Sequence, residues 1–265
     1  MLELDSDRQA GLARTLEESA RVLAAVRYGS AFPFGVGRVV LNPDNPLATG
    51  SFAAGLDGDL GDVERTLLAL PLVWREAGRH QVVVLASPSS APELDLLAEE
   101  CGYEAAEETT TMLLTDPRQL VDHEPGVLAR PLPEEHEDQL GPLLARAFDW
   151  SPSVGRRLQV VQGHRLDDPR HVALAAVEGG EVLGVGTGFL HGATGQVVHV
   201  AVARAARGRR LGRALASAVS STLLQRGASL VWLTAEAGSL TERFFAGLGF
   251  EPAYDAVLFT CPVEP

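Results

Sequence analysis

The segment Val197–Leu215 reads VVHVAVARAARGRRLGRAL and contains the features that decide the fold. Residues 197–203 form an almost continuous apolar run, which is typical of a strand covered on both faces. From Leu211 onward apolar residues recur at helical spacing, and Gly227 stands where a C-terminal cap is expected. The segment therefore predicts a buried strand that leads through a short loop into a helix.

The loop between this strand and helix combines small residues with concentrated positive charge. Five of the ten residues 204–213 are arginine, in a chain of formal net charge −13. Gly208 and Gly212 allow close approach to the backbone, and a helix N-terminus attracts anions. Because each cation there costs about 0.3–1 kcal/mol, several arginines indicate a bound anion. A solvated basic helix start without a ligand is the alternative.

A second pattern occurs once in each half of the chain. An apolar run, a small-residue turn and a short helix precede Gly-aromatic-Glu at Gly102–Glu104 and again at Gly249–Glu251. The two glycines lie 147 residues apart (249 − 102), and the same offset superimposes the helix-like stretch Glu64–Gly78 on Leu211–Gln225. Three elements in one order favour a tandem duplication joined within residues 115–133. Two unrelated α/β domains are the alternative.

Periodicity and turn residues predict the other elements of the second half. Gly179 and Gly180 supply the positive φ angles of a tight hairpin turn. We expect a strand at 126–131, helices at 134–148 and 153–166, and a hairpin of strands 172–177 and 182–190. The buried strand 197–203 and the helix from residue 211 follow, and then a strand at 230–234, a helix at 240–248 and a strand at 256–260. The alternating Gly184, Gly186 and Gly188 clear one face of a hairpin strand, for a ligand or for packing.

The segment 197–215 resembles the core motif of the GNAT superfamily of N-acyltransferases, a strand followed by Q/R-x-x-G-x-G/A at a helix start. Arg207 matches the leading position and Gly212 the last, whereas Arg210 replaces the middle glycine. The resemblance implies acyl-CoA as the anion. It implies a pyrophosphate site at Arg207, Gly208, Arg209, Arg210, Gly212 and Arg213, and hydrogen bonds from the pantetheine arm to the backbone of Val200, Ala201 and Val202.

The resemblance covers nearly the whole second half. We therefore expect an α/β fold of tandem GNAT-like domains, each a mixed, mostly antiparallel sheet flanked by helices, with a splayed strand pair at the CoA site. The expected bounds are 1–118 for a degenerate domain and 126–265 for the catalytic domain. At the 147-residue offset the arginine-rich loop falls on Asp57–Asp62, where acids replace the arginines. We expect the first domain to bind no CoA and to serve a structural or substrate-shaping role.

Acyl transfer to an amine needs a base for the amine and an acid for the leaving thiolate. His199 lies in the buried strand beside the expected acyl site and is a candidate base. Glu236 ends the next strand, at the edge where ligands of α/β sheets collect. Tyr254 is a third catalytic candidate. The alternatives are a core histidine, a solvent-facing cap and a packing tyrosine.

One position departs from the family pattern. A tyrosine acid often stands four residues before the glycine that here is Gly249, but this chain has Phe245. We expect an N-acetyltransferase that uses acetyl-CoA, or another acyl-CoA, as cosubstrate for a primary amine of a small molecule. The phenylalanine keeps open a non-catalytic acyl-CoA-binding or regulatory module. A structural pair of pseudo-enzymes that binds no CoA is the third possibility.

Charge and composition bound the partners. A net charge of −13 disfavours nucleic acid and anionic membranes and suits amine substrates. The sequence has no apolar run of membrane-spanning length and begins with an acidic stretch, so we expect a cytoplasmic protein. Cys101 and Cys261 lack partners at metal-ligand spacing, and no metal is expected. Motifs of hydrolases, zincins and nucleotide triphosphatases are absent. We expect a monomer or a homodimer.

Overall fold

The computed structural model describes residues 2, 4–27, 29–121 and 129–263. The chain divides into two compact units. Unit 1 contains Met1–Met112, Thr234–Glu242 and Pro252–Pro265, and unit 2 contains Leu113–Leu233 and Arg243–Glu251. The units therefore differ from the contiguous segments 1–118 and 126–265, because the end of the chain returns to unit 1. The expected start of the second domain, residue 126, lies outside the described residues.

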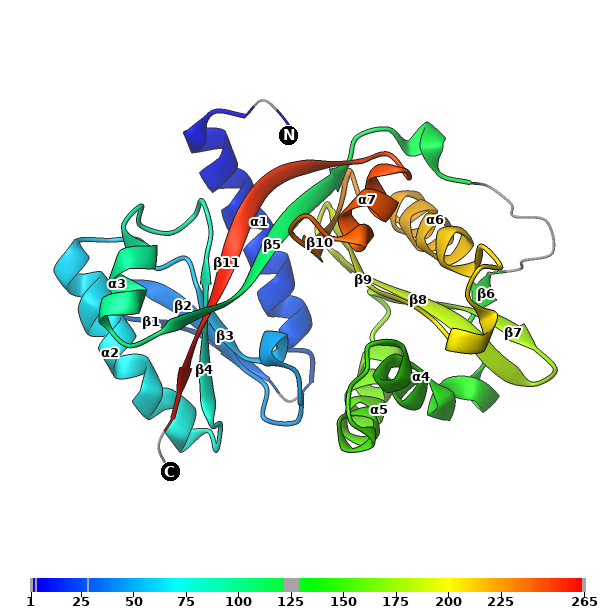
Figure 1. The fold of residues 1–265 in the computed structure, drawn as a ribbon, viewed down its shortest axis with the longest axis horizontal. Coiled ribbons are helices and arrows are strands. Elements are labelled where there is room, and N and C mark those ends of the chain that lie inside the picture. Colours follow the sequence, from blue (N-terminus) through cyan, green and yellow to red (C-terminus); the bar gives the residue numbers. More distant parts are fainter. Residues whose placement is uncertain (1, 3, 28, 122–128, 264–265) are drawn as a thin grey trace. The chain divides into compact units, whose positions relative to one another are not determined.

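Unit 1 contains the strand order β1-β2-β3-β4-β11-β5 (Figure 1). The last strand of the chain pairs antiparallel with β4, from Val257↔Ala86 to Pro262↔Gln81. Val84 faces the core under α2 and α3, whereas Val83 packs against α1 on the opposite face. The elements are α1 (Ser6–Ala24), β1 (Ser30–Phe34), β2 (Gly37–Leu41), β3 (Phe52–Ala54), α2 (Leu60–Glu76), β4 (Gln81–Ala86), α3 (Leu94–Glu100), β5 (Glu104–Leu114) and β11 (Phe250–Pro262).

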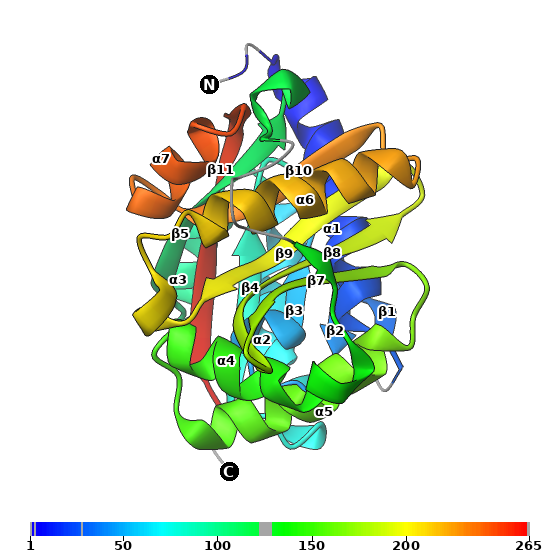
Figure 2. The same ribbon diagram turned by 90° about the vertical axis from the view of Figure 1, so that its right-hand side faces the viewer.

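Unit 2 contains the strand order β10-β9-β8-β7-β6, in which only β9 and β10 pair in parallel. Helix α6 covers one face of β7–β9, and α4 and α5 cover the other (Figure 2). The elements are β6 (Arg130–Pro131), α4 (Leu140–Ala147), α5 (Pro152–Leu166), β7 (His171–Glu178), β8 (Glu181–His191), β9 (Thr194–Val202), α6 (Leu211–Gln225), β10 (Leu230–Glu236) and α7 (Leu240–Ala246). The end of β10 from Thr234 and the start of α7 up to Glu242 belong to unit 1.

The elements expected in the second half are present in the expected order. The hairpin turn has φ 59° at Gly179 and 82° at Gly180, as its sequence predicts. The expected helix 134–148 is divided into a 3₁₀ turn, Glu134–Gln139, and α4. Pro142 explains the division, because it has no N–H to continue a helix from the preceding turn. Of the expected strand 126–131, residues 126–128 lie outside the described residues.

The two halves share one order of elements. In the first half β3, α2, β4 and α3 follow one another, and in the second half β9, α6, β10 and α7 do the same. Within each set the two strands pair in parallel. The fold is thus a tandem arrangement of one architecture, as the 147-residue repeat predicts. Among the described residues, no helix combines the length and the apolar character that crossing a membrane requires.

The alternating glycines of β8 make room for α6. A Cβ added to Gly186 would lie 2.7 Å from Val219 Cγ2 and 3.2 Å from the backbone oxygen of Leu215. We expect Gly186→Ala to lower the free energy of unfolding by about 1–3 kcal/mol, measured by urea denaturation. The control is Gly163→Ala in α5, where an added Cβ meets no atom within 4 Å. It should raise the stability by up to about 1 kcal/mol. Equal effects would contradict the close packing.

Candidate functional site

Strands β9 and β10 pair over only part of their length. They pair only from Leu230↔Thr194 to Trp232↔Gln196, although β9 continues to Val202. On its other edge β9 stays paired with β8 through Gly184↔Val202, and a bulge leaves Val198 without a partner residue. No described strand pairs with the β10-facing edge of residues 197–202. That edge offers backbone N–H and C=O groups to an extended ligand.

The loop after β9 presents backbone amides at the start of α6. Gly208 and Arg210 adopt left-handed conformations, with φ angles of 80° and 59°. Arg210 is the N-cap of α6, and its side chain makes no capping hydrogen bond. A left-handed conformation at a residue other than glycine costs about 1–3 kcal/mol. Arg210, which replaces the middle glycine of the motif, is exposed and adopts the backbone conformation that glycine adopts most easily. The N–H groups in the first turn of α6 have no partner within the helix, so they can bind an anion.

The arginines of this loop differ in their contacts. Arg209 forms a bidentate pair with Glu178 at 2.9 and 3.1 Å, and Arg204 pairs with Asp149. Arg207 donates from Nη2 to the carbonyl of Ala147 at 3.1 Å. Within the described ranges, neither Arg207 nor Arg213 meets a carboxylate. These two guanidinium groups leave a positive charge at the helix start that an anion can neutralise.

The corresponding loop of unit 1 is acidic. Helix α2 begins after Asp59 and carries Asp62 in its first turn, where Arg65 pairs with Asp62. Carboxylates at a helix N-terminus stabilise it by about 0.3–1 kcal/mol each. They also repel a phosphate group. The carboxylates of residues 57–62 therefore stabilise the start of α2 without a bound anion.

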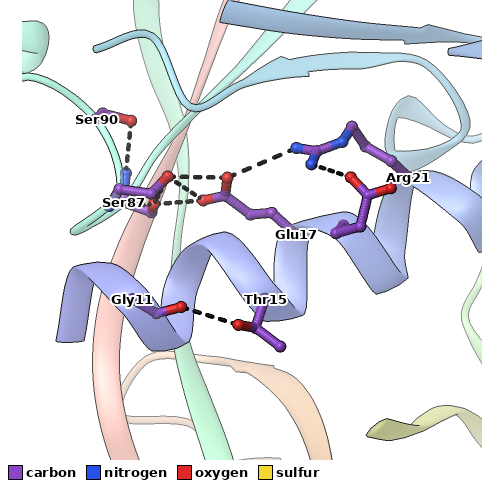
Figure 3. A network of polar contacts seen from close by, with 8 residues as sticks. Gly11, Thr15, Glu17, Arg21, Ser87 and Ser90 are labelled. Atoms are coloured by element: carbon purple, nitrogen blue, oxygen red, sulfur yellow. Dashed lines mark hydrogen bonds and ion pairs between the residues drawn. The ribbon is translucent and has the colours of Figure 1, made fainter. Parts of the chain in front are cut away.

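Unit 1 contains a cavity of about 490 Å³ whose lining includes α1 and the end of β3. Glu17 is 3% exposed and accepts hydrogen bonds from the hydroxyls of Ser87 and Ser89 (Figure 3). Arg21 Nη1 lies 3.9 Å from Glu17 Oε2 and pairs more closely with Glu18. Burial raises the pKa of Glu17 and outweighs the lowering effect of these partners.

We expect Glu17→Gln to raise the free energy of unfolding at pH 7. The folded-state pKa of Glu17 lies above its ordinary value, so ionisation destabilises the folded chain at neutral pH. The amide keeps an oxygen acceptor for the serine hydroxyls. The gain should vanish as pH falls below about 4.5, where the glutamate is protonated in both states. Urea denaturation at pH 7 and pH 4 measures it. The exposed Glu64 supplies the control Glu64→Gln, and a loss of stability in Glu17→Gln at pH 7 would contradict the prediction.

The face of the unit 2 sheet opposite α6 is polar near the middle of β9. The strand register pairs His199 of β9 with Thr187 of β8. Two residues further along β8, Phe189 lies between Gln196 of β9 and His171 of β7. Thr187 Oγ1 lies 3.2 Å from His199 Nδ1. His199 therefore belongs to a row of polar side chains on the face that α4 and α5 cover.

Two features shape the surroundings of His199. The ring of Phe148 lies 6.1 Å from the imidazole and stacks on Trp150 at 4.8 Å, so an aromatic pair stands over this row. Burial and then the positive charge of Arg165 lower the pKa of His199 to about 3, and the same two causes lower the pKa of His171 to about 3. Both imidazoles are therefore neutral at pH 7.

The other two catalytic candidates lie in unit 1. Glu236 is exposed at the end of β10, and after burial its charge is the second cause that raises the pKa of Glu107. Tyr254 is 5% exposed in β11, where burial raises its pKa and a hydrogen bond with Thr111 opposes this effect. The structure does not bring either residue into the same unit as His199, and their catalytic roles stay predictions.

Phe245, the residue at the usual tyrosine position, is a core residue of unit 2. It is 6% exposed and makes edge contacts with Phe250 at 5.5 Å and with Phe244 at 5.0 Å between ring centres. It supplies no exchangeable proton. In the described part of the chain, no group of three His, Cys, Asp or Glu side chains is arranged to hold a metal ion.

Sequence reasoning missed the polar residues that surround His199. Helix α5 buries Leu158, Val161, Gln162 and Arg165 on one stripe. The available signal was the spacing, because Gln162 and Arg165 occupy positions of the helical period that the core would normally fill with apolar residues. His171 directly precedes the expected hairpin strand and gave no comparable signal.

Comparison with known proteins identifies the architecture. Residues 133–250 match the sequence model of the Acetyltransferase (GNAT) family. No curated protein matches the sequence. Among solved structures, a GCN5-related N-acetyltransferase from Kribbella flavida is 19% identical with a TM-score of 0.70, and the alignment covers 95% of each chain.

Two further structures share this fold. A tandem GNAT protein from the clavulanic acid biosynthesis pathway is 17% identical with a TM-score of 0.63, over 99% of this chain and 98% of the other. A GCN5-related N-acetyltransferase from Sphaerobacter thermophilus is 21% identical with a TM-score of 0.62, over 87% and 82% of the two chains. The matches extend over both halves, which shows a tandem GNAT fold.

Proposed function

We propose that the protein transfers an acetyl group from acetyl-CoA to a primary amine of a small molecule, because residues 133–250 match the Acetyltransferase (GNAT) family model and the chain has a tandem GNAT fold. The observation that carries the proposal is the separation of β9 from β10 immediately before an arginine-rich helix start. An acyl-CoA requires an edge for its amide-containing arm and an anion site for its pyrophosphate. One strand, loop and helix of unit 2 offer both.

The proposed cofactor contacts follow the chemistry of each segment. The free edge of β9 hydrogen-bonds the pantetheine amides through the backbone of Val200, Ala201 and Val202. The pyrophosphate lies at the start of α6, where it would accept hydrogen bonds from backbone N–H groups and from the loop arginines. The residues of that site are Arg207, Gly208, Arg209, Arg210, Gly212 and Arg213.

In the proposed reaction the amine nitrogen attacks the thioester carbon, the C–S bond breaks, and the amine gives up a proton. His199 is the proposed proton acceptor, directly or through water, because it belongs to β9, the strand with the free edge, and its imidazole is neutral at pH 7. A pKa of about 3 means that His199 holds a proton weakly. An anion beside Arg165 would remove one cause of that low pKa. The proton then passes to the leaving thiolate.

A non-catalytic acyl-CoA-binding module is the second candidate, because Phe245 cannot protonate a thiolate. The two candidates differ in turnover. An enzyme releases free CoA from acetyl-CoA in the presence of suitable amines, whereas a binding module holds acetyl-CoA with no amine-dependent release.

Isothermal titration of the full chain with acetyl-CoA tests the binding step. We expect one molecule per chain, because the unit 1 loop carries Asp59 and Asp62 where unit 2 carries arginines. At about a hundred times its dissociation constant, acetyl-CoA should raise the free energy of unfolding by roughly 2.7 kcal/mol. Two molecules per chain would contradict the assignment of unit 1, and no binding would overturn the proposed function.

A further inference from the structure

Unit 2 contains a buried arginine without a counter-ion. Arg165, on the inner stripe of α5, is 6% exposed. Its guanidinium makes no hydrogen bond or ion pair with any described residue, and burial is the one cause that lowers its pKa, to about 10. The nearby Asp168 is already bonded to Arg170 at 2.7 and 3.0 Å. A charge that is largely removed from water costs free energy unless a partner compensates it, so folded proteins pair most such groups.

Other polar atoms around Arg165 also lack partners. Gln162 is fully buried, and neither its Nε2 nor its Oε1 has a hydrogen-bond partner. His171 is 7% exposed with both ring nitrogens unpartnered, and Gln196 Oε1 is unpartnered as well. The charge of Arg165 lowers the pKa of both His171 and His199, which places these rings within its electrostatic reach. We call Gln162, Arg165, His171, Gln196 and His199 the α5 cluster.

The α5 cluster has the donor set of an anion site. A guanidinium, a side-chain amide and imidazoles supply N–H groups, and the described residues place no unpaired carboxylate among them. The single formal charge at neutral pH matches a monoanion. A carboxylate is planar and accepts two parallel hydrogen bonds from an arginine fork, which gives it the best geometric match.

The position of the cluster relates this anion to the reaction. The cluster lies on the sheet face that α4 and α5 cover, and it includes His199, whose strand has the free edge. We infer that the α5 cluster is a carboxylate subsite and that the acceptor is an amino-carboxylate, with its carboxylate on Arg165 and its amine toward His199. That the bound carboxylate belongs to the acceptor rests on the proposed function. The anion site at Arg165 does not depend on it.

Acetate and acetamide form a pair of probes that are nearly equal in shape and differ in charge. At matched ionic strength, acetate should raise the melting temperature of the full chain, and acetamide should not. Arg165→Gln should abolish the acetate effect and leave the acetyl-CoA effect unchanged. Arg156→Gln is the matched control, because Arg156 is an exposed arginine of the same helix, and it should retain both effects.

The outcomes separate the two proposals. If acetyl-CoA stabilises the chain and acetate does not, the carboxylate subsite is overturned while the proposed function stands. If acetate stabilises through Arg165 and acetyl-CoA does not, the subsite stands and the proposed function fails. Stabilisation by inorganic phosphate in place of acetate overturns the carboxylate assignment. If Arg165→Gln does not fold, the double variant Arg207→Glu with Arg213→Glu takes its place: acetate should still stabilise it, and loss of the acetate effect there would overturn the subsite.

Turnover gives a second readout. With amino-carboxylate acceptors, Arg165→Gln should raise KM roughly 10- to 150-fold, the range expected for a lost charge-assisted hydrogen bond. Acceptors of the same length without a carboxylate should show equal KM for both proteins. An equal rise of KM for both acceptor types would indicate a merely structural role and overturn the assignment.

Discussion

Replacing Arg207 and Arg213 together by glutamate is expected to raise the dissociation constant of acetyl-CoA by roughly two to four orders of magnitude. Within the described residues, these two loop arginines meet no carboxylate, whereas Arg204 and Arg209 each pair with one. Each charge-assisted hydrogen bond contributes about 1.5–3 kcal/mol, and 1.4 kcal/mol corresponds to a factor of ten. Isothermal titration measures the constant, and circular dichroism checks that α6 still forms.

The control for this prediction changes charge to the same extent elsewhere. Arg75 of α2 and Arg156 of α5 are exposed. Arg75→Glu with Arg156→Glu should alter acetyl-CoA binding by less than about threefold at physiological ionic strength, because neither residue belongs to the loop at the start of α6 and salt screens exposed charges. If both double variants weaken binding equally, the effect comes from net charge and not from a pyrophosphate site at α6.

Stability should fall steeply in mild acid because of His171, which is buried, and His199, which is partly buried. The pKa values of His171 and His199 are lowered to about 3, below the ordinary 6.5. A lowered histidine pKa means that, between the two pKa values, the unfolded chain binds more protons than the folded chain. The stability is therefore fully present above pH 6.5 and is lost as pH falls toward 3, at up to about 1.4 kcal/mol per pH unit for each histidine.

His171→Leu isolates one of these contributions. Between pH 6 and pH 4 it should reduce the slope of unfolding free energy against pH by about 1 kcal/mol per pH unit, measured by urea denaturation. At pH 7 its stability should be unchanged or higher, because two unpartnered nitrogens are removed. The exposed His80, replaced by glutamine, is the control and should keep the wild-type slope. An unaltered slope in His171→Leu would contradict a buried, neutral histidine.

Several features followed from the sequence for local reasons. The apolar run 197–203 and the periodic stripe from Leu211 predicted β9 and α6, because side-chain spacing within one element depends on neighbouring residues. The Gly-Gly hairpin turn was predicted because only small residues adopt its positive φ angles readily. The repeat at an offset of 147 residues predicted the tandem architecture, since both halves carry the same order of local signals.

Long-range partners could not be predicted in this way. The strand 250–262 carries an apolar pattern that suits either half, and only the tertiary structure shows that it pairs with β4 in unit 1. Tyr254 consequently lies in unit 1. For the alternating glycines of β8, packing and ligand binding were equally compatible with the sequence, and the contacts of Val219 show that α6 packs there.

The sequence by itself determined the order of strand, loop and helix at residues 197–215 and the positive charge of the loop. It also determined that the corresponding loop of the first half, near Asp57, is acidic. The tertiary structure alone decided where β9 leaves β10 and that Arg165 is buried beside His171 and His199. The physical reason is the range of the forces. Backbone propensity and charge act between neighbours in the chain, whereas strand pairing and the cost of a buried charge depend on residues that only folding brings together.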